Sequence, residues 1–198
     1  IDDKEHAKTA VKCGIDMLRA VDLFNERVII PEGRPPVGMG AGINTGLGYV
    51  GEMGSTKRHS YDVLGDAVST AARIESKCKE YGCLLLVGEN TYKATKDDFL
   101  YLKVDNLQVK GKSVGLEIYT VLDRGTPAWT VAQRKHEQMH KAYKEQDFDE
   151  AIRLCKTVYT NFDHRMEKYY DMWIERCEYM KTQDLPPDWN GVFIATSK

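Results

Sequence analysis

Several features that mark other classes of protein are scarce in this chain of 198 residues. The longest uninterrupted apolar runs, residues 84–87 and 28–30, are far shorter than the roughly 20 apolar residues that a membrane-spanning helix needs. The net charge of −2 gives no overall attraction to nucleic acid or to an anionic membrane. We therefore expect no nucleic-acid partner, and we expect contact with a membrane only through segments upstream of this chain.

Cysteine is also scarce, and its positions do not suggest a scaffold. The five cysteines are an odd number for a disulfide framework, and they are scattered along the chain. Only Cys78 and Cys83 are near neighbours, and neither a second pair nor a nearby histidine completes a zinc site. Reduced cysteines in a cytoplasmic protein, some of them in the core, are the expected state.

The chain divides into a mixed first part and a helical second part. In the first part the hydrophobic pattern predicts a helix over residues 5–26, which a proline-rich break follows. The glycine-rich residues 37–53 are predicted to form a two-stranded hairpin with its turn near residues 44–46. A helix is then expected to end at Gly82, which suits a C-cap. The later elements expected are a buried strand at 83–88, a short helix at 89–97 and two strands at 99–112 and 115–122.

From residue 127 onward the pattern is entirely helical. Three amphipathic segments follow, and residues 141–159 have the pattern of one tetratricopeptide-like helical hairpin. A single such unit is not stable alone, so we expect these helices to pack on the preceding residues. The expected units are residues 1–124 and a helical extension at 125–198.

The stretch YDVLGDAVSTAARIES, residues 61–76, contains the candidate chemistry. Gly65 allows a tight turn, and Asp66 is a plausible N-cap for the helix that follows. Ser69 and Arg73 are four residues apart, so they lie on one face near the positive end of the helix. A hydroxyl and a guanidinium placed there suit ribose and phosphate oxygens. Asp62, just before the turn, is placed to accept a hydrogen bond from an exocyclic amine.

A structural interpretation of the same stretch needs no ligand. The helix would then be a capped packing helix, with Arg73 in an ion pair with Glu75, Glu80 or another neighbour. From local physics alone this interpretation is favoured by about two to one.

A wider set of motifs reverses that preference. Four segments closely resemble the linked motifs of the class III nucleotidyl cyclases, the adenylate and guanylate cyclases. They are residues 43–55, Arg58, residues 61–73 and the Val-Lys-Gly of residues 109–111. The resemblance covers about residues 5–123, and several linked motifs are far more specific than any one of them. The helical tail is similar to that of bacterial cyclases whose catalytic domain is C-terminal.

The resemblance implies roles for four residues. Asp62 occupies the purine-reading position, where Asp or Thr goes with adenine and guanylate cyclases usually have Cys. Arg73 corresponds to the arginine that stabilises charge on the phosphates in the transition state, and Lys110 to the lysine that binds the triphosphate. Ser69 stands where the family usually has an Asn that orients the ribose. Losing a well-placed contact there costs roughly 3 kcal/mol, or a hundredfold in rate, so we expect reduced turnover.

The resemblance also implies metal ions that this chain does not bind by itself. In the family, two aspartates in the first half of the domain hold two Mg²⁺ or Mn²⁺ ions. The opening residues match the helix after that half, so we expect the chain to be a piece of a longer protein. Asp2 and Asp3 are interpreted as solvated acids that begin a helix. We assign no metal ligand in this chain, and we expect negligible cyclase activity from the chain alone.

The fold implied is α+β: a ferredoxin-like class III cyclase core, with an antiparallel sheet that carries helices on one face. The core is expected to be incomplete at the N-terminus and to be followed by the α-helical extension. The function implied is an adenylate cyclase for intracellular signalling that converts ATP to 3′,5′-cyclic AMP and pyrophosphate. A homodimer is the expected partner arrangement, with the site at the subunit interface, where the glycine-rich hairpin would lie.

Three alternatives remain at this point. The first is a non-catalytic cyclase-like module that binds nucleotide or a regulatory partner, and the second is a helical scaffold around residues 127–181. The third is a zinc protease, since residues 136–140 read HEQMH. That motif has no third ligand and lies in a helix expected to be solvated, and we give it about one chance in thirty.

Overall fold

The computed structural model describes residues 3–55, 58–107, 115–122, 127–158, 166–191 and 193. In chain order the elements of the first part are α1 (His6–Phe24), the π-helical η1 (Asn25–Ile29), β1 (Ala41–Ile43), β2 (Tyr49–Ser55), β3 (Arg58–Leu64), α2 (Asp66–Ser76), α3 (Cys78–Tyr81), β4 (Leu85–Gly88), α4 (Glu89–Thr95), β5 (Leu100–Leu107) and β6 (Leu116–Leu122). The second part forms α5 (Pro127–Lys144), α6 (Phe148–Val158) and α7 (Glu167–Met180).

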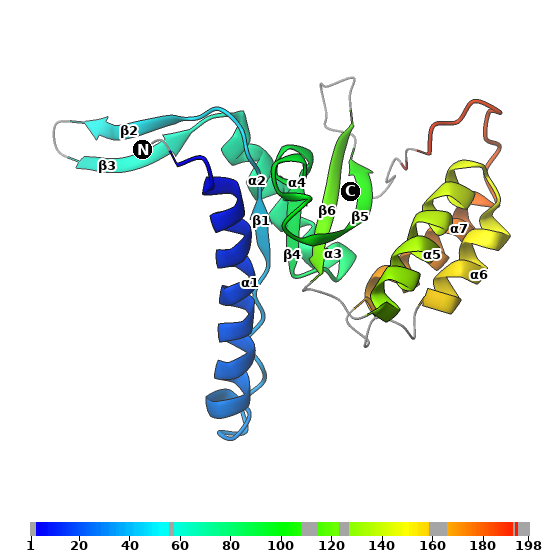
Figure 1. Ribbon diagram of the computed structural model, residues 1–198, viewed down its shortest axis with the longest axis horizontal. Coiled ribbons are helices and arrows are strands. Elements are labelled where there is room, and N and C mark those ends of the chain that lie inside the picture. The colour runs from blue at the N-terminus through cyan, green and yellow to red at the C-terminus, as the bar shows by residue number, and fades with distance from the viewer. Residues whose placement is uncertain are drawn as a thin grey trace.

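A four-stranded sheet organises the first part of the chain (Figure 1). Its strand order is β1-β4-β6-β5, in which β1 is parallel to β4 and the other two pairs are antiparallel. β2 and β3 form a separate antiparallel hairpin that extends away from the sheet. The expected α+β class is therefore present, although the sheet is mixed and not purely antiparallel.

The expected hairpin over residues 37–53 is wrong in its pairing. Residues 41–43 join the main sheet beside β4, and the glycine-rich residues after them begin the β2–β3 hairpin instead. The two interpretations share the same apolar–glycine alternation, which predicts strands but does not identify their partners. The partner of β1 is the distant strand β4, whose four residues are all buried.

Helices cover both faces of the sheet, which corrects the expectation of one covered face. On one face, Val11 of α1 packs with the side chains of Val87, Tyr101 and Tyr119. On the other face, the alternate residues of the same strands pack against α2, α3 and the C-terminal helices. The alternation of neighbouring residues between the two clusters is what a strand buried on both sides requires.

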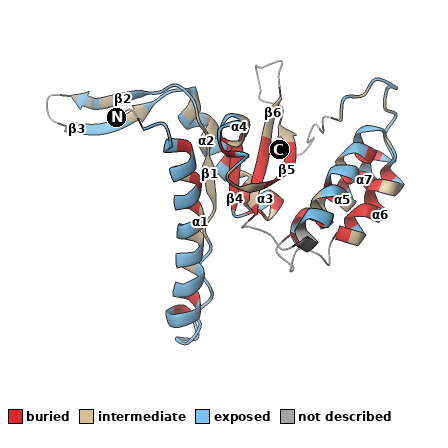
Figure 2. Ribbon diagram, in the orientation of Figure 1, coloured by how far each residue is buried: buried red, intermediate tan, exposed pale blue. Residues whose placement is uncertain are grey.

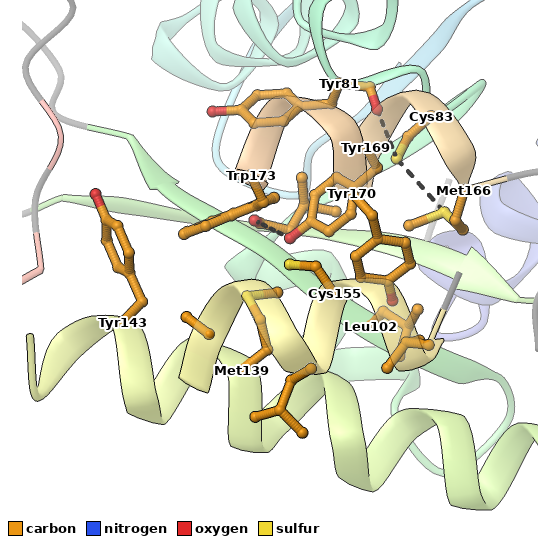
Figure 3. Packing of buried hydrophobic residues seen from close by; sticks show 14 of the residues in the cluster. Tyr81, Cys83, Leu102, Met139, Tyr143, Cys155, Met166, Tyr169, Tyr170 and Trp173 are labelled. Carbon is orange, nitrogen blue, oxygen red and sulfur yellow. Dashed lines mark hydrogen bonds between the residues drawn. The ribbon is translucent and has the colours of Figure 1, made fainter. Parts of the chain in front are cut away.

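The C-terminal helices share their core with the sheet, as expected from their single hairpin. Figure 3 shows Tyr169, Tyr170 and Trp173 of α7 beside Met139 of α5, with Leu102 of β5 in the same cluster. Buried residues concentrate in the sheet and in α5–α7, whereas α1 is mostly exposed (Figure 2). The division into residues 1–124 and 125–198 stays a prediction, because residues 123–126 lie outside the described part.

None of the helices in the described ranges has the length and apolar content that spanning a bilayer demands.

Candidate functional site

The turn between β3 and α2 depends on Gly65. Its φ of +151° is one that residues with a side chain rarely adopt, and a Cβ there would lie 2.9 Å from the carbonyl oxygen of Leu47. The N-cap residue is Gly65 and α2 begins at Asp66, so the prediction that Asp66 is the N-cap is wrong by one residue. Among the described residues no side-chain hydrogen bond caps the start of α2, and the Val68 and Ser69 amides donate to the Gly65 carbonyl oxygen.

Ser69 and Arg73 lie on the exposed side of α2, opposite the buried Ile74. Ser69 Oγ donates a hydrogen bond to the Asp66 carbonyl oxygen at 3.1 Å, which leaves its lone pairs available to accept. Among the residues that the structure describes, no hydrogen bond or ion pair involves the Arg73 guanidinium. The predicted partner Glu80 pairs instead with Lys77 at 2.5 Å. The packing interpretation of Arg73 therefore has no contact to support it.

Asp62 lies on β3, exposed, opposite Gly51 of β2. Its Oδ1 accepts a hydrogen bond from the Val63 amide at 2.7 Å. The other carboxylate oxygen stays available to an incoming N–H donor. Asp62 and the Ser69–Arg73 face are thus joined by one short turn, and both are open to solvent.

Two residues that sequence reasoning did not single out hold α2 in place. Gly42 of β1 faces the helix so closely that a Cβ would lie 2.5 Å from the Ala71 carbonyl oxygen and would overlap the Glu75 backbone. Asn44 Nδ2 donates to the Ala67 carbonyl oxygen at 3.2 Å. The backbone that comes close to Gly42 is therefore that of the chain's own helix α2.

Lys110, the fourth predicted site residue, lies outside the described residues. The strand that leads to it, β5, is described up to Leu107. Its proposed role therefore stays a prediction from the sequence.

Large apolar side chains are exposed around Asp62 on the β2–β3 hairpin. The exposed fractions are 97% for Leu47, 82% for Tyr49 and 77% for Tyr61. Val50 and Leu64 are more than half exposed as well. Tyr49 and Leu64 pair across the two strands, so they lie on one face of the hairpin together with Asp62. Large exposed apolar side chains of this kind favour an interaction site.

No group of three or more His, Cys, Asp or Glu side chains that could hold a metal ion occurs within the described ranges. The HEQMH histidines lie in the core and not on a solvated face. His136 is fully buried, with its Nδ1 2.8 Å from the Tyr170 hydroxyl, and His140 Nε2 is 3.0 Å from the Tyr169 hydroxyl. Burial lowers the pKa of His136 to about 4, so its ring is neutral. The two histidines are core hydrogen-bonding residues.

Comparison with known proteins covers both parts of the chain. Residues 2–123 match the family model for the adenylate and guanylate cyclase catalytic domain. The terminal-differentiation specific adenylate cyclase of Dictyostelium discoideum is 33% identical over 195 residues, which is 93% of this chain and 9% of that protein. An adenylate cyclase of Anabaena cylindrica is 34% identical over 125 residues, 60% of this chain and 25% of that protein.

Two solved structures carry the same similarity. The adenylyl cyclase CyaB from P. aeruginosa aligns at 30% identity with a TM-score of 0.54, over 62% of this chain and 61% of that chain. The guanylyl cyclase Cya2 aligns at 34% identity with a TM-score of 0.54, over 63% of this chain and 62% of that one. The chain thus spans less than two thirds of the relatives that it matches. Its sequence and its fold agree that it belongs to the family of adenylate and guanylate cyclase catalytic domains.

Proposed function

We propose that this chain contains the C-terminal portion of an adenylate cyclase catalytic domain, acting in the cytoplasm in intracellular signalling. The reaction converts ATP to 3′,5′-cyclic AMP and pyrophosphate. The observation that carries the proposal is the exposed Arg73 guanidinium, one turn beyond Ser69, in a domain of the cyclase family. All five cysteines are free thiols, which supports a reducing compartment.

In the proposed reaction, the ribose 3′-hydroxyl loses its proton to solvent and its oxygen forms a bond to the α-phosphorus. The bond from the α-phosphorus to the oxygen of the β-phosphate breaks, which releases pyrophosphate. Arg73 neutralises charge that develops on the phosphate oxygens, and Lys110 binds the triphosphate. Ser69 Oγ accepts a hydrogen bond from a ribose hydroxyl while it keeps its bond to the Asp66 carbonyl. The other carboxylate oxygen of Asp62 accepts a hydrogen bond from the exocyclic amine of adenine, which favours ATP over GTP.

The proposed active form is a dimer in which the β2–β3 hairpin meets a second copy. The exposed Tyr49 and Leu64 support this, because they pair across the strands on the same face of the hairpin as Asp62. Closing a second chain over this face would bury the apolar side chains and exclude water from the nucleotide.

Among the described residues, no suitable set of ligands occurs for the two Mg²⁺ or Mn²⁺ ions that we propose for the intact domain. We assign them no residue of this chain and derive no step through them.

The proposal is tested by assaying cyclic nucleotide formation by the native full-length protein with ATP and with GTP, in the wild type and in Arg73→Ala. We expect turnover of ATP to exceed that of GTP and to fall by roughly a hundredfold or more in the variant, since a transition-state contact is lost. Arg134→Ala, which removes an exposed arginine from α5, is the matched control and should leave the rate unchanged.

If the wild-type protein binds ATP without forming cyclic AMP, the proposal is wrong and the non-catalytic, nucleotide-binding alternative is favoured. Equal rates of cyclic AMP formation in the wild type and in Arg73→Ala would show that Arg73 does not act in the site.

A further inference from the structure

The helix that carries Ser69 and Arg73 continues almost without a break into α3. Only Lys77 separates α2 from α3, and its own backbone is helical. The Lys77 amide donates to the Ile74 carbonyl oxygen at 3.1 Å, and the Tyr81 amide donates to the Lys77 carbonyl oxygen at 3.0 Å. A displacement of Tyr81 along this helical unit is therefore passed on to Arg73, which lies about two turns earlier.

The C-terminal helix α7 binds the far end of this unit through a buried charge. Tyr81 is the last residue of α3 and is 1% exposed. Its hydroxyl donates to Asp105 Oδ2 at 2.5 Å, and the same oxygen accepts from Arg176 of α7 at 2.7 Å. The side chains of Arg176 and Asp105 are 5% and 9% exposed, so the ion pair is buried. One carboxylate of β5 thus joins the end of α3 to α7.

Lys168 of α7 supplies a second contact at the same end. Its Nζ donates to the carbonyl oxygen of Lys79, in the last turn of α3, where a helix leaves carbonyl groups unpaired. Its stem lies against Gly82, whose φ of +67° ends the helix. A Cβ at Gly82 would lie 2.8 Å from the Lys168 Cβ, so the two segments are in close contact.

The buried side of α2 shares one hydrophobic cluster with α7. Ile74, the residue after Arg73, is fully buried and belongs to the same cluster as Tyr169. Just beyond α3, Cys83 Sγ lies 3.9 Å from the Sδ of Met166, the N-cap residue of α7. Figure 3 shows Cys83 beside Met166 and Tyr169. The side of the unit opposite Arg73 therefore packs on the helical extension.

We propose that α7 positions the phosphate-binding face of α2, because Arg176 and Lys168 hold the end of the helical unit that carries Arg73. The inference rests on the proposed function of Arg73 and Ser69. Near its start α2 is held by Asn44, and at its far end the unit is held by α7, so losing either contact displaces the guanidinium. A displacement of about 1 Å at a reacting group already costs on the order of a hundredfold in rate.

The comparison with a relative supports a role for the helical extension in cyclase chemistry. The family model ends at residue 123, yet the similarity to the Dictyostelium adenylate cyclase covers 93% of this chain. Similarity of that extent continues well into the helical extension.

Tyr81→Phe tests the proposal, since it breaks the link to Asp105 and keeps both the ring and the buried ion pair. In the native full-length protein we expect kcat for ATP to fall about tenfold. KM should stay within about twofold, because Arg73 acts on charge that develops in the transition state. Tyr143→Phe is the matched control: Tyr143 is buried in the helical core, and its hydroxyl has no hydrogen-bond partner within the described part of the chain. Its kcat should be unchanged.

Lys168→Met breaks the second link without disturbing the core, because Lys168 is exposed. Methionine keeps an apolar stem beside Gly82 and removes only the ammonium group. Added to Tyr81→Phe, it should lower kcat by a further two- to fivefold, about the strength of a cation at a helix C-terminus. Lys156→Met, at an exposed position near the end of α6, is the control and should have no effect. A wild-type kcat in the combined variant of Tyr81 and Lys168 would overturn the proposal.

A double-mutant cycle separates positioning from a general loss of stability. If α7 acts through Arg73, then adding Tyr81→Phe to Arg73→Ala should cause no further loss of kcat. Fully additive losses would overturn the proposal, because they would show that the two residues act independently.

Backbone hydrogen exchange tests the anchoring of α2 separately from the chemistry. Amides of residues 73–81 should exchange at least about tenfold faster in Tyr81→Phe than in Tyr143→Phe, because a hydrogen bond to a charged group is lost. Equal exchange would overturn the inference even if Arg73→Ala is inactive. A fully active Arg73→Ala variant would instead overturn the proposed function of Arg73, and faster exchange in that case would still show that α7 anchors α2.

Discussion

Gly42 shows how a single residue fixes the distance between two elements. Its missing side chain lets β1 contact the backbone of α2 at Ala71 and Glu75. The glycine-rich sequence does not identify this partner, because a glycine specifies the space it leaves and not the group that fills it.

Gly42→Ala should therefore displace α2, with Arg73 and Ser69 on it. We expect the free energy of unfolding to fall by about 1–3 kcal/mol or more, as in overpacked cores, when it is measured by urea denaturation. Gly51→Ala is the control, since it lies in a strand with no atom within 4 Å of the added carbon and should be nearly neutral. Similar losses in the two variants would contradict the close contact.

At the scale of elements, α5 shows how one sequence motif can serve a different purpose. HEQMH does place His136 and His140 on one helical face, as the sequence predicted. That face packs against the tyrosines of α7, whose burial raises the pKa of Tyr169 and Tyr170. Helical spacing identifies a shared face, but only the packing of α7 shows that the face is buried.

The buried histidine makes stability depend on pH. In the unfolded chain His136 takes up a proton near the ordinary histidine pKa of 6.5, whereas the folded protein resists protonation down to a pKa of about 4. The contribution of the neutral, buried His136 to the free energy of unfolding is therefore fully present above pH 6.5, and it is lost as the pH falls towards 4. Glutamine can make the same two hydrogen bonds without titrating. The difference in unfolding free energy between the wild type and His136→Gln should narrow by about 2 kcal/mol between pH 6.5 and 5.

The measurement is urea denaturation at several pH values in that range. A difference that stays constant over this range would show that His136 is not held neutral by the fold.

At the scale of the whole molecule, the β2–β3 hairpin extends away from the sheet (Figure 1). Its exposed residues include several large apolar ones: Tyr49, Val50, Tyr61 and Leu64. The sequence predicted an interface near this glycine-rich region, although it assigned the wrong strands to the hairpin.

Tyr49→Glu should weaken the proposed dimer, because it places a charge in an apolar interface. We expect the dissociation constant from analytical ultracentrifugation to rise at least tenfold. Val131→Glu, at an exposed apolar position on α5, should leave it unchanged. A wild-type protein that stays monomeric at all concentrations would contradict the dimer.

Local sequence patterns predicted most of the helices and the strands β4, β5 and β6 within a few residues, and they placed Asp62, Ser69 and Arg73 around the turn at Gly65. These follow from local periodicity and from short-range spacing, which the chain carries within one or two turns. They did not predict the β2–β3 pairing, the pairing of β1 with β4, the cover of helices on both faces of the sheet, or the contact of α7 with β5. Those features depend on contacts between residues far apart in the chain, such as Asp105 with Arg176, and no local pattern specifies its distant partner.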